Sequence, residues 1–245
     1  MCVFLSMWQI ADSNAIRLVR IHMARVIGEV GCGCRIRRFS QGDGIRHMQI
    51  GKHSVSLTFD DGPGPSTLPL LDVLRQAGWT ATFFALGKNL VDCTELAMDI
   101  VRDGHVLGNH TYSHAREGQL SDGELLVEIE RTDALIRNVY LKSGLPAPEN
   151  IPLRLPYGIT RDDRRLHVLD RIGRRHVGWT LLVDDWQRPA PSPDSLVHAM
   201  TRHVESQAAM GTPTVFCLHD GSRHGEERPA TVEAVEKFLI WVRKL

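Results

Sequence analysis

Two adjacent carboxylates, Asp60 and Asp61, stand at the end of an apolar segment of this 245-residue chain. Residues 55–59 alternate between apolar and hydroxyl side chains, as expected for a strand, and Gly62-Pro63 ends the pattern. Neighbouring residues of a strand point to opposite faces, so two buried carboxylates within one strand would be costly. Where the strand stops, both can turn into one cleft if a cation neutralises them. In isolation, the tetrapeptide Asp60-Asp61-Gly62-Pro63 would be as typical of a surface turn as of a functional site.

Two histidines, His110 and His114, follow the strand-like residues 105–109. Histidines four positions apart can face the same way on a helical turn or a compact loop, where both imidazoles can bind one metal ion. Without other signals, we would interpret them as unrelated loop residues. A carboxylate at the end of a neighbouring predicted strand changes that interpretation. One carboxylate and two imidazoles give a three-ligand site with open positions, the arrangement of a catalytic zinc.

Three further segments place polar residues where an apolar run ends: Arg154-Leu155-Pro156-Tyr157-Gly158, Asp184-Asp185-Trp186 and His219-Asp220-Gly221. Each alone has a simpler interpretation, with Arg154 in a surface ion pair, Trp186 in the core and His219 in a loop. Parallel α/β folds build their sites at the carboxyl ends of the strands. Together with Asp60-Asp61 and His110–His114, these make five polar segments that stand where an apolar run ends. Five such segments in one chain favour a single shared site.

The elements that must position these residues alternate between strand and helix after residue 53. Predicted strands cover residues 54–59, 80–86, 105–108, 176–182 and 213–218. Predicted helices cover residues 68–77, 94–103, 121–140, 161–173, 193–209 and 229–243. The third of these helices begins with a capping box formed by Ser121 and Glu124. This order implies a mostly parallel sheet with crossover helices.

Composition and charge are those of an ordinary globular domain, with 42% apolar and 24% charged residues. Lys+Arg and Asp+Glu both number 29, so nothing indicates a nucleic-acid partner. The five cysteines are odd in number and scattered, which favours a reduced compartment over a disulfide scaffold. Cys32-Gly33-Cys34 has too short a spacing for the usual zinc-chelating turn.

The first 50 residues are weakly patterned and arginine-rich. We expect a weakly structured N-terminal extension over residues 1–50 and one domain over residues 51–245. Residues 1–10 are apolar but too short to span a bilayer, no basic segment precedes them, and no small-residue cleavage site clearly follows. We therefore expect no membrane span and, since the sequence gives no good case for export, a cytoplasmic location.

Five segments resemble, in order, the five motifs of polysaccharide deacetylases, which form carbohydrate esterase family 4 and are also called NodB-homology domains. These segments are Thr58–Pro63, His110–His114, Arg154–Tyr157, Asp185-Trp186 and His219-Asp220. The resemblance covers about residues 53–245. The single-domain form and the segment Asp185–Pro189 look most like the rhizobial chitooligosaccharide deacetylase branch.

This resemblance implies an α/β fold, a distorted and incomplete (β/α) barrel of the NodB-homology type. It also implies a hydrolase that removes acetyl groups from N-acetylglucosamine units of chitin-type oligosaccharides and releases acetate. The implied cofactor is a divalent metal, with Zn²⁺ the first expectation. The alternatives are a deacetylase of peptidoglycan or another acetylated glycan, and a non-catalytic glycan-binding descendant.

The site residues are carried over by position from the family's motifs. Asp60 would be the general base and His219 the general acid, while Trp186 would form a wall of the acetyl pocket. The metal would be bound by Asp61, His110 and His114. Arg154 would orient the base, and Asp185 would orient the acid. The backbone amide of Tyr157 would stabilise the oxyanion.

These roles agree with the chemistry of amide hydrolysis. The carboxylate of Asp60 must stay ionised to accept a proton, which a neighbouring arginine and a metal favour. The leaving amine must be protonated, a task suited to a histidine supported by a carboxylate.

The chain departs from the family's pattern at two positions. Leu182 stands where the fourth motif normally begins with an acidic residue, and Asp184 is the candidate substitute. Cys217 stands where the fifth motif normally has a leucine that lines the acetyl pocket. Since cysteine is a small hydrophobe, we expect an apolar but wider pocket.

Overall fold

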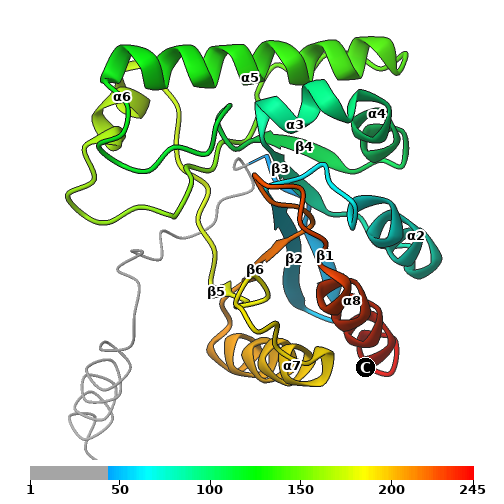
Figure 1. Ribbon diagram of the computed structural model, residues 1–245. Coiled ribbons are helices and arrows are strands. Elements are labelled where there is room, and N and C mark those ends of the chain that lie inside the picture. The colour runs from blue at the N-terminus through cyan, green and yellow to red at the C-terminus, as the bar shows by residue number, and fades with distance from the viewer. Residues whose placement is uncertain (1–43) are drawn as a thin grey trace, which may run out of the picture. The chain divides into compact units, whose positions relative to one another are not determined.

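The computed structural model describes residues 44–245, so residues 1–43 of the extension expected over residues 1–50 lie outside the described residues. A central sheet has the strand order β4-β3-β2-β6-β5, and neighbouring strands in this order are all parallel (Figure 1). β1 pairs with the start of β2 in the antiparallel direction. The strands are β1 (Met48–Ile50), β2 (His53–Asp60), β3 (Thr82–Ala85), β4 (Val106–Asn109), β5 (Leu181–Leu182) and β6 (Thr214–His219).

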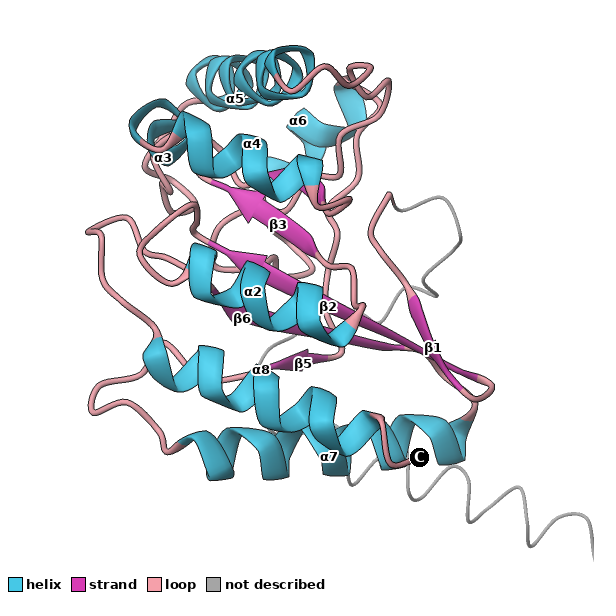
Figure 2. Ribbon diagram, turned by 90° about the vertical axis from the view of Figure 1, so that its right-hand side faces the viewer, coloured by secondary structure: helices cyan, strands magenta, loops and turns pink. Residues whose placement is uncertain are grey.

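Helices connect the parallel strands and lie outside the sheet (Figure 2). They are α2 (Thr67–Ala77), α3 (Gly87–Asp92), α4 (Thr94–Arg102), α5 (Asp122–Lys142), α6 (Arg165–Arg171), α7 (Pro193–Met210) and α8 (Pro229–Val242). The capping box predicted at the start of α5 is present, with Ser121 and Glu124 bonding each other's backbone N–H. In the part of the chain that the structure describes, no helix is both long and apolar enough to cross a membrane.

Side chains of β2 alternate between the two faces of the sheet. Val55, Leu57 and Phe59 belong to the main hydrophobic core, which includes side chains from helices α2, α4, α7 and α8. The residues between them, ending with Thr58 and Asp60, therefore point to the opposite, inner face. The functional carboxylate thus lies at the carboxyl end of the inner face, as expected for a parallel α/β fold.

The sheet does not close into a complete barrel. Beyond β4, an isolated parallel bridge joins Asn109 to Leu153, and a second joins Leu153 to His176. The segment after His176 then crosses to the other edge, where β5 pairs with β6. This topology is the distorted, incomplete barrel that the resemblance implies.

The predicted strand over residues 176–182 is shorter in the structure, since only Leu181–Leu182 form a strand. The physical reason is Arg154, whose guanidinium donates to the carbonyl oxygens of Val177 and Gly178. Because these two carbonyls accept hydrogen bonds from the Arg154 side chain, they do not pair with a neighbouring strand, and the strand is interrupted there.

The other predicted strands and helices are confirmed within a few residues. β1 and the six-residue α3 were not predicted. The strand β1 (Met48–Ile50) lies within the residues that the sequence analysis assigned to the extension. The division into an extension and one domain otherwise stays a prediction.

Candidate active site

The end of β2 brings the carboxylates of Asp60 and Asp61 together beside His110. Asp60 is the last residue of the strand, and Asp61 has a left-handed φ of 71°. This conformation is costly for a residue other than glycine and breaks the strand's alternation. Both side chains are almost fully buried, with residue exposures of 3% for Asp60 and 8% for Asp61. Nε2 of His110 lies 3.8 Å from Oδ2 of Asp60 and 3.4 Å from Oδ1 of Asp61, so both carboxylates approach this imidazole.

Asp61, His110 and His114, here called the metal triad, bring three ligand atoms together. The Oδ1 atom of Asp61 lies 3.1 Å from Nε2 of His114 and 3.4 Å from Nε2 of His110. That oxygen is buried and has no hydrogen-bond partner among the described residues. Nδ1 of His110 lies 2.8 Å from the carbonyl oxygen of Arg154, so it donates there and leaves Nε2 for a cation. The donor set therefore fits a divalent metal ion.

The loop between the two histidines is held by two side chains that the sequence analysis did not single out. Asn109 accepts from the N–H of Thr111 at 2.8 Å and donates to Ile129 and Asp133. Glu128 on α5 accepts from the N–H groups of Tyr112 and Ser113 and from the Ser113 hydroxyl.

These contacts fix a compact loop in which Thr111 and His114 both have positive φ. The structure thus selects the compact loop over the helical turn for the two histidines. The loop needs external support because each positive φ is unfavourable for a side chain with a Cβ.

Arg154 is the largest fully buried side chain of the described residues. Its Nη1 atom lies 2.7 Å from Oδ1 of Asp60 and 2.7 Å from the hydroxyl of Thr58. The guanidinium also stacks over the Phe84 ring, 4.1 Å from the centroid. Burial alone would raise the pKa of Asp60, but the Arg154 guanidinium, with His110 and His219, outweighs it and the pKa is lowered. Asp60 is therefore an ionised carboxylate at neutral pH.

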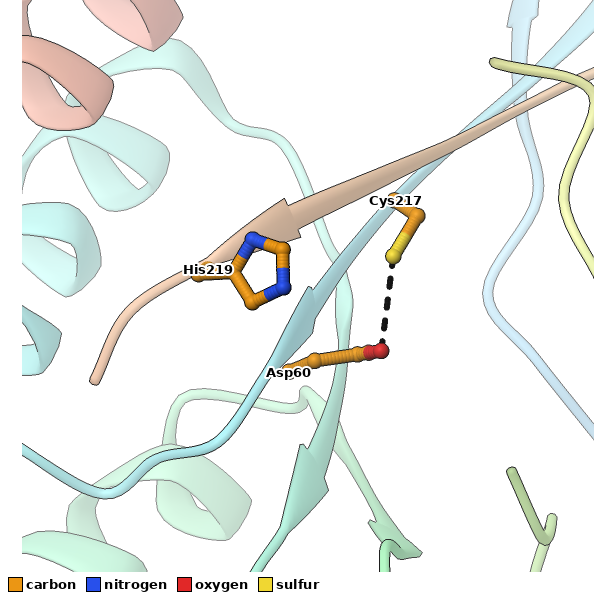
Figure 3. A group of neighbouring side chains, drawn as sticks. All are labelled: Asp60, Cys217 and His219. Carbon is orange, nitrogen blue, oxygen red and sulfur yellow. Dashed lines mark hydrogen bonds between the residues drawn. The ribbon is translucent and has the colours of Figure 1, made fainter. Parts of the chain in front are cut away.

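The second oxygen of Asp60 faces Cys217. The Cys217 thiol donates to Oδ2 over 3.3 Å, and His219 lies beside this pair (Figure 3). The thiol is buried, and burial together with the Asp60 charge raises its pKa well above the usual range. Cys217 is therefore a neutral thiol in direct contact with the predicted base.

His219 is held by Asp185 from the loop after β5. Its ring Nδ1 donates to Oδ1 of Asp185 at 2.8 Å, and the hydroxyl of Thr231 donates to Oδ2 at 2.7 Å. Burial would lower the pKa of His219, but the Asp185 carboxylate reverses this and raises the pKa to about 9. The imidazole is therefore protonated at neutral pH and can serve as an acid.

Tyr157 lies on a turn beside the metal triad. Its φ is 63°, and its hydroxyl lies 3.1 Å from Nδ1 of His114. Arg165, which the sequence analysis did not predict, donates to the carbonyl oxygens of Pro156 and Gly158 on either side of it. The backbone at Tyr157 is thereby fixed at the edge of the site.

The fourth motif is only partly buried. Trp186 follows Asp185 directly and is about half exposed, so its ring is available to a ligand. Leu182 lies in β5 opposite Cys217, and Asp184, the candidate substitute for the missing acidic residue, is exposed. The structure thus favours a solvated Asp184.

The supporting residues Asn109, Glu128, Arg165 and Thr231 could not be recognised because their partners are distant in sequence or are backbone groups. Asn109 is the nearest to a readable signal, since it directly precedes His110 at the end of a predicted strand.

Comparison with known proteins gives a consistent result. The model of the polysaccharide deacetylase family matches residues 47–177. A chitooligosaccharide deacetylase of Bradyrhizobium sp. (strain ANU 289) is 35% identical over 184 residues, 74% of this chain and 77% of that protein. A peptidoglycan-N-acetylglucosamine deacetylase of Bacillus cereus is 31% identical over 193 residues, 78% of this chain and 82% of that protein. A family 4 carbohydrate esterase from Streptomyces lividans, solved with acetate, superposes with a TM-score of 0.62 at 30% identity, covering 78% and 88% of the two chains.

Proposed function

The chain belongs to the polysaccharide deacetylase family and is a hydrolase of carbon–nitrogen bonds, and we propose that it is a metal-dependent N-deacetylase of chitin-type oligosaccharides. The observation that carries this proposal is the position of Asp60. Its carboxylate lies beside the metal triad, 3.8 Å from Nε2 of His110, yet its oxygens contact Arg154 and Cys217. A base next to a cation site, with its own counterion, is what hydrolysis by an activated water requires.

The metal triad would hold the divalent ion, and Zn²⁺ suits its two imidazoles and one carboxylate. Bound there, the ion would supply a Lewis acid that lowers the pKa of a water molecule toward neutrality. The position of Oδ1 of Asp61 supports this assignment, because this buried oxygen and the Nε2 atoms of His110 and His114 lie within 4.8 Å of one another, as three ligands of one ion would.

The protein's own groups would carry the protons. Asp60, kept ionised by Arg154, accepts a proton from the attacking water. His219, kept protonated by Asp185, donates a proton to the leaving amine. The backbone N–H of Tyr157 stabilises the negative charge on the carbonyl oxygen, and removing one such donor typically costs about 10²–10³ in rate.

The acetylated glycan is proposed from the relatives. The chitooligosaccharide deacetylase of Bradyrhizobium is 35% identical to this chain, against 31% for the Bacillus cereus deacetylase described above, which favours N-acetylglucosamine oligomers. The Bacillus cereus relative makes peptidoglycan the second candidate. The cytoplasmic location expected from the sequence belongs to the same proposal, since a cytoplasmic enzyme meets soluble oligomers more readily than cell-wall polymer.

The test is acetate release from a panel of glycans, run on protein treated with a chelator and then resupplied with Zn²⁺. We expect release from N-acetylglucosamine oligomers only after metal is restored. Undiminished activity in the chelated protein would contradict the metal dependence. Release from peptidoglycan alone would replace the proposed substrate, and metal binding without release from any glycan would favour a binding module. Cell fractionation checks the location.

A further inference from the structure

Asp60, Cys217 and His219, here called the thiol cluster, form a second group of metal-ligating side chains beside the metal triad. One ligand atom from each residue lies within 4.8 Å of the other two. The metal triad meets the same limit. The described part of the chain thus brings two donor sets to the end of β2, and they share no residue.

The parallel pairing of β2 and β6 explains the thiol cluster. Asp60 lies opposite His219 in this pairing. Cys217 precedes His219 by two positions on β6, so both side chains point to the same face. The cluster is therefore fixed by strand register and does not depend on a mobile loop.

The partners of the cluster leave one ligand atom of each residue directed at a common space. Arg154 occupies Oδ1 of Asp60, while Oδ2 lies 3.3 Å from the Cys217 sulfur (Figure 3). Nδ1 of His219 donates to Asp185, which leaves Nε2 as the ligand nitrogen. A histidine backed by a carboxylate in this way is the usual arrangement behind a metal-bound imidazole.

We propose that the thiol cluster is a second cation site, which binds thiophilic divalent ions such as Cd²⁺ and Zn²⁺ with release to solvent of the Cys217 thiol proton and the Nε2 proton of His219, and thereby inhibits the enzyme. Sulfur ligands select soft ions, whereas the metal triad offers only nitrogen and oxygen. Tetrahedral zinc sites place neighbouring ligand atoms about 3.3–3.7 Å apart. The Oδ2–Sγ separation of 3.3 Å already meets this requirement, and the ligand nitrogen of His219 lies within 4.8 Å of both atoms.

An ion in the thiol cluster would bind the oxygen of the base that faces the cleft and the nitrogen through which the acid donates its proton. Both proton-transfer groups would be blocked together. This inhibitory consequence rests on the proposed function, but the existence of the site does not. Acetate release should therefore rise as an ion binds the metal triad and fall as a second ion binds the thiol cluster.

The site itself is tested by titrating metal-free full-length protein with Co²⁺ and with Cd²⁺. The matched control is Cys217→Ser, which keeps the metal triad and the other four cysteines. We expect wild-type protein to bind one more ion than the variant and to show a sulfur-to-cobalt absorption band that the variant lacks. Cys217→Ala should give the same loss, which guards against weak ligation by the serine. Equal ion counts in wild type and both folded variants would overturn the proposal.

The inhibition is tested by measuring acetate release as Cd²⁺ is added to the zinc-loaded enzyme. Wild-type activity should fall as the second ion binds, and Cys217→Ser should require at least about tenfold more Cd²⁺ for the same fractional loss. Unchanged activity in protein that holds the extra ion would refute the inhibitory role. If the zinc-loaded enzyme released no acetate before Cd²⁺ was added, the proposed function would be contradicted. The number of ions bound by wild type and by Cys217→Ser would still decide whether the thiol cluster is a cation site.

Discussion

Asp185 binds His219 through two hydrogen bonds, one from the ring and one from the backbone. The ring Nδ1 donates to Oδ1 and the backbone N–H donates to Oδ2, both at 2.8 Å. The second bond ties the carboxylate to the same strand end that carries the imidazole. Asp185 therefore fixes the position, the orientation and the charge of His219 together.

We expect Asp185→Asn to move the basic limb of the pH–rate profile to lower pH. The Asp185 carboxylate raises the pKa of His219 to about 9, against 6.5 for an unperturbed histidine. With that charge removed, the pKa of His219 falls from about 9 toward that of an unperturbed histidine, so the protonated form is lost at a lower pH as the pH rises. The measurement is kcat/KM for deacetylation between pH 5 and 10. A basic limb that stays near pH 9 would show that His219 is not the titrating acid.

Folding stability gives a separate readout of the same pair. Because the pKa of His219 is higher in the folded protein than in the unfolded chain, its stabilising contribution is fully present below about pH 6.5. It is lost as the pH rises through about 9. The wild-type free energy of unfolding should therefore fall over this window, and Asp185→Asn should remove this part of the dependence. Urea titrations at several pH values measure both.

Asp60→Asn and His110→Ala should separate catalysis from metal binding. The asparagine keeps the size of the side chain but cannot accept the proton, so acetate release should fall by about 10²–10⁴ while metal content stays near normal. His110→Ala removes a metal ligand and should lose both. Metal analysis alongside acetate assays checks this. Wild-type activity in Asp60→Asn would show that another group is the base.

Arg154→Met should destabilise the fold far more than the same change at an exposed arginine. Arg154 is fully buried, and its loss leaves the Asp60 carboxylate without a counterion, at a cost of about 3–5 kcal/mol. Arg75 also pairs with two aspartates, but its side chain is 54% exposed, so Arg75→Met should change stability little. Urea denaturation compares the two variants, and equal losses would contradict the dominant role of burial.

The sequence allowed the candidate ligands to be grouped, but not the residues that support them. Asp61, His110 and His114 could be grouped because their residue types and positions after predicted strands indicate one chemistry. Thr231 on α8 carries no such signal, because it acts only through Asp185, which is far away in sequence. Residues 176–182 read as a strand because their apolar pattern does not reveal that Arg154 would bind their carbonyls.

Gly62→Ala should destabilise the protein through a steric clash. A Cβ at Gly62 would collide with the carboxyl group of Asp220, which is fully buried and accepts from the Thr67 hydroxyl. Overpacking of this kind costs about 1–3 kcal/mol. The control is Gly123→Ala near the start of α5, where a Cβ meets nothing within 4 Å and should be neutral or stabilising. Thermal melts compare the two, and a stable Gly62→Ala would mean that the Asp220 carboxyl can move aside.

Arg165→Lys should slow deacetylation without removing the metal. The Arg165 guanidinium holds the carbonyls on both sides of Tyr157 and also pairs with Asp163 at 2.6 Å. Lysine keeps the charge but cannot hold both carbonyls and the carboxylate in one plane. The Tyr157 backbone N–H would then lose its orientation, and the loss of rate is bounded by the about 10²–10³ of an oxyanion donor.

Tyr157→Phe is the matched control, because it keeps the backbone N–H and removes only the hydroxyl near His114. We expect this variant to retain most of its kcat, whereas Arg165→Lys loses kcat with little change in KM. That split would point to an interaction made in the transition state alone. If Tyr157→Phe lowered kcat more than Arg165→Lys, the tyrosine would act through its hydroxyl. The role proposed for its backbone N–H would then be contradicted.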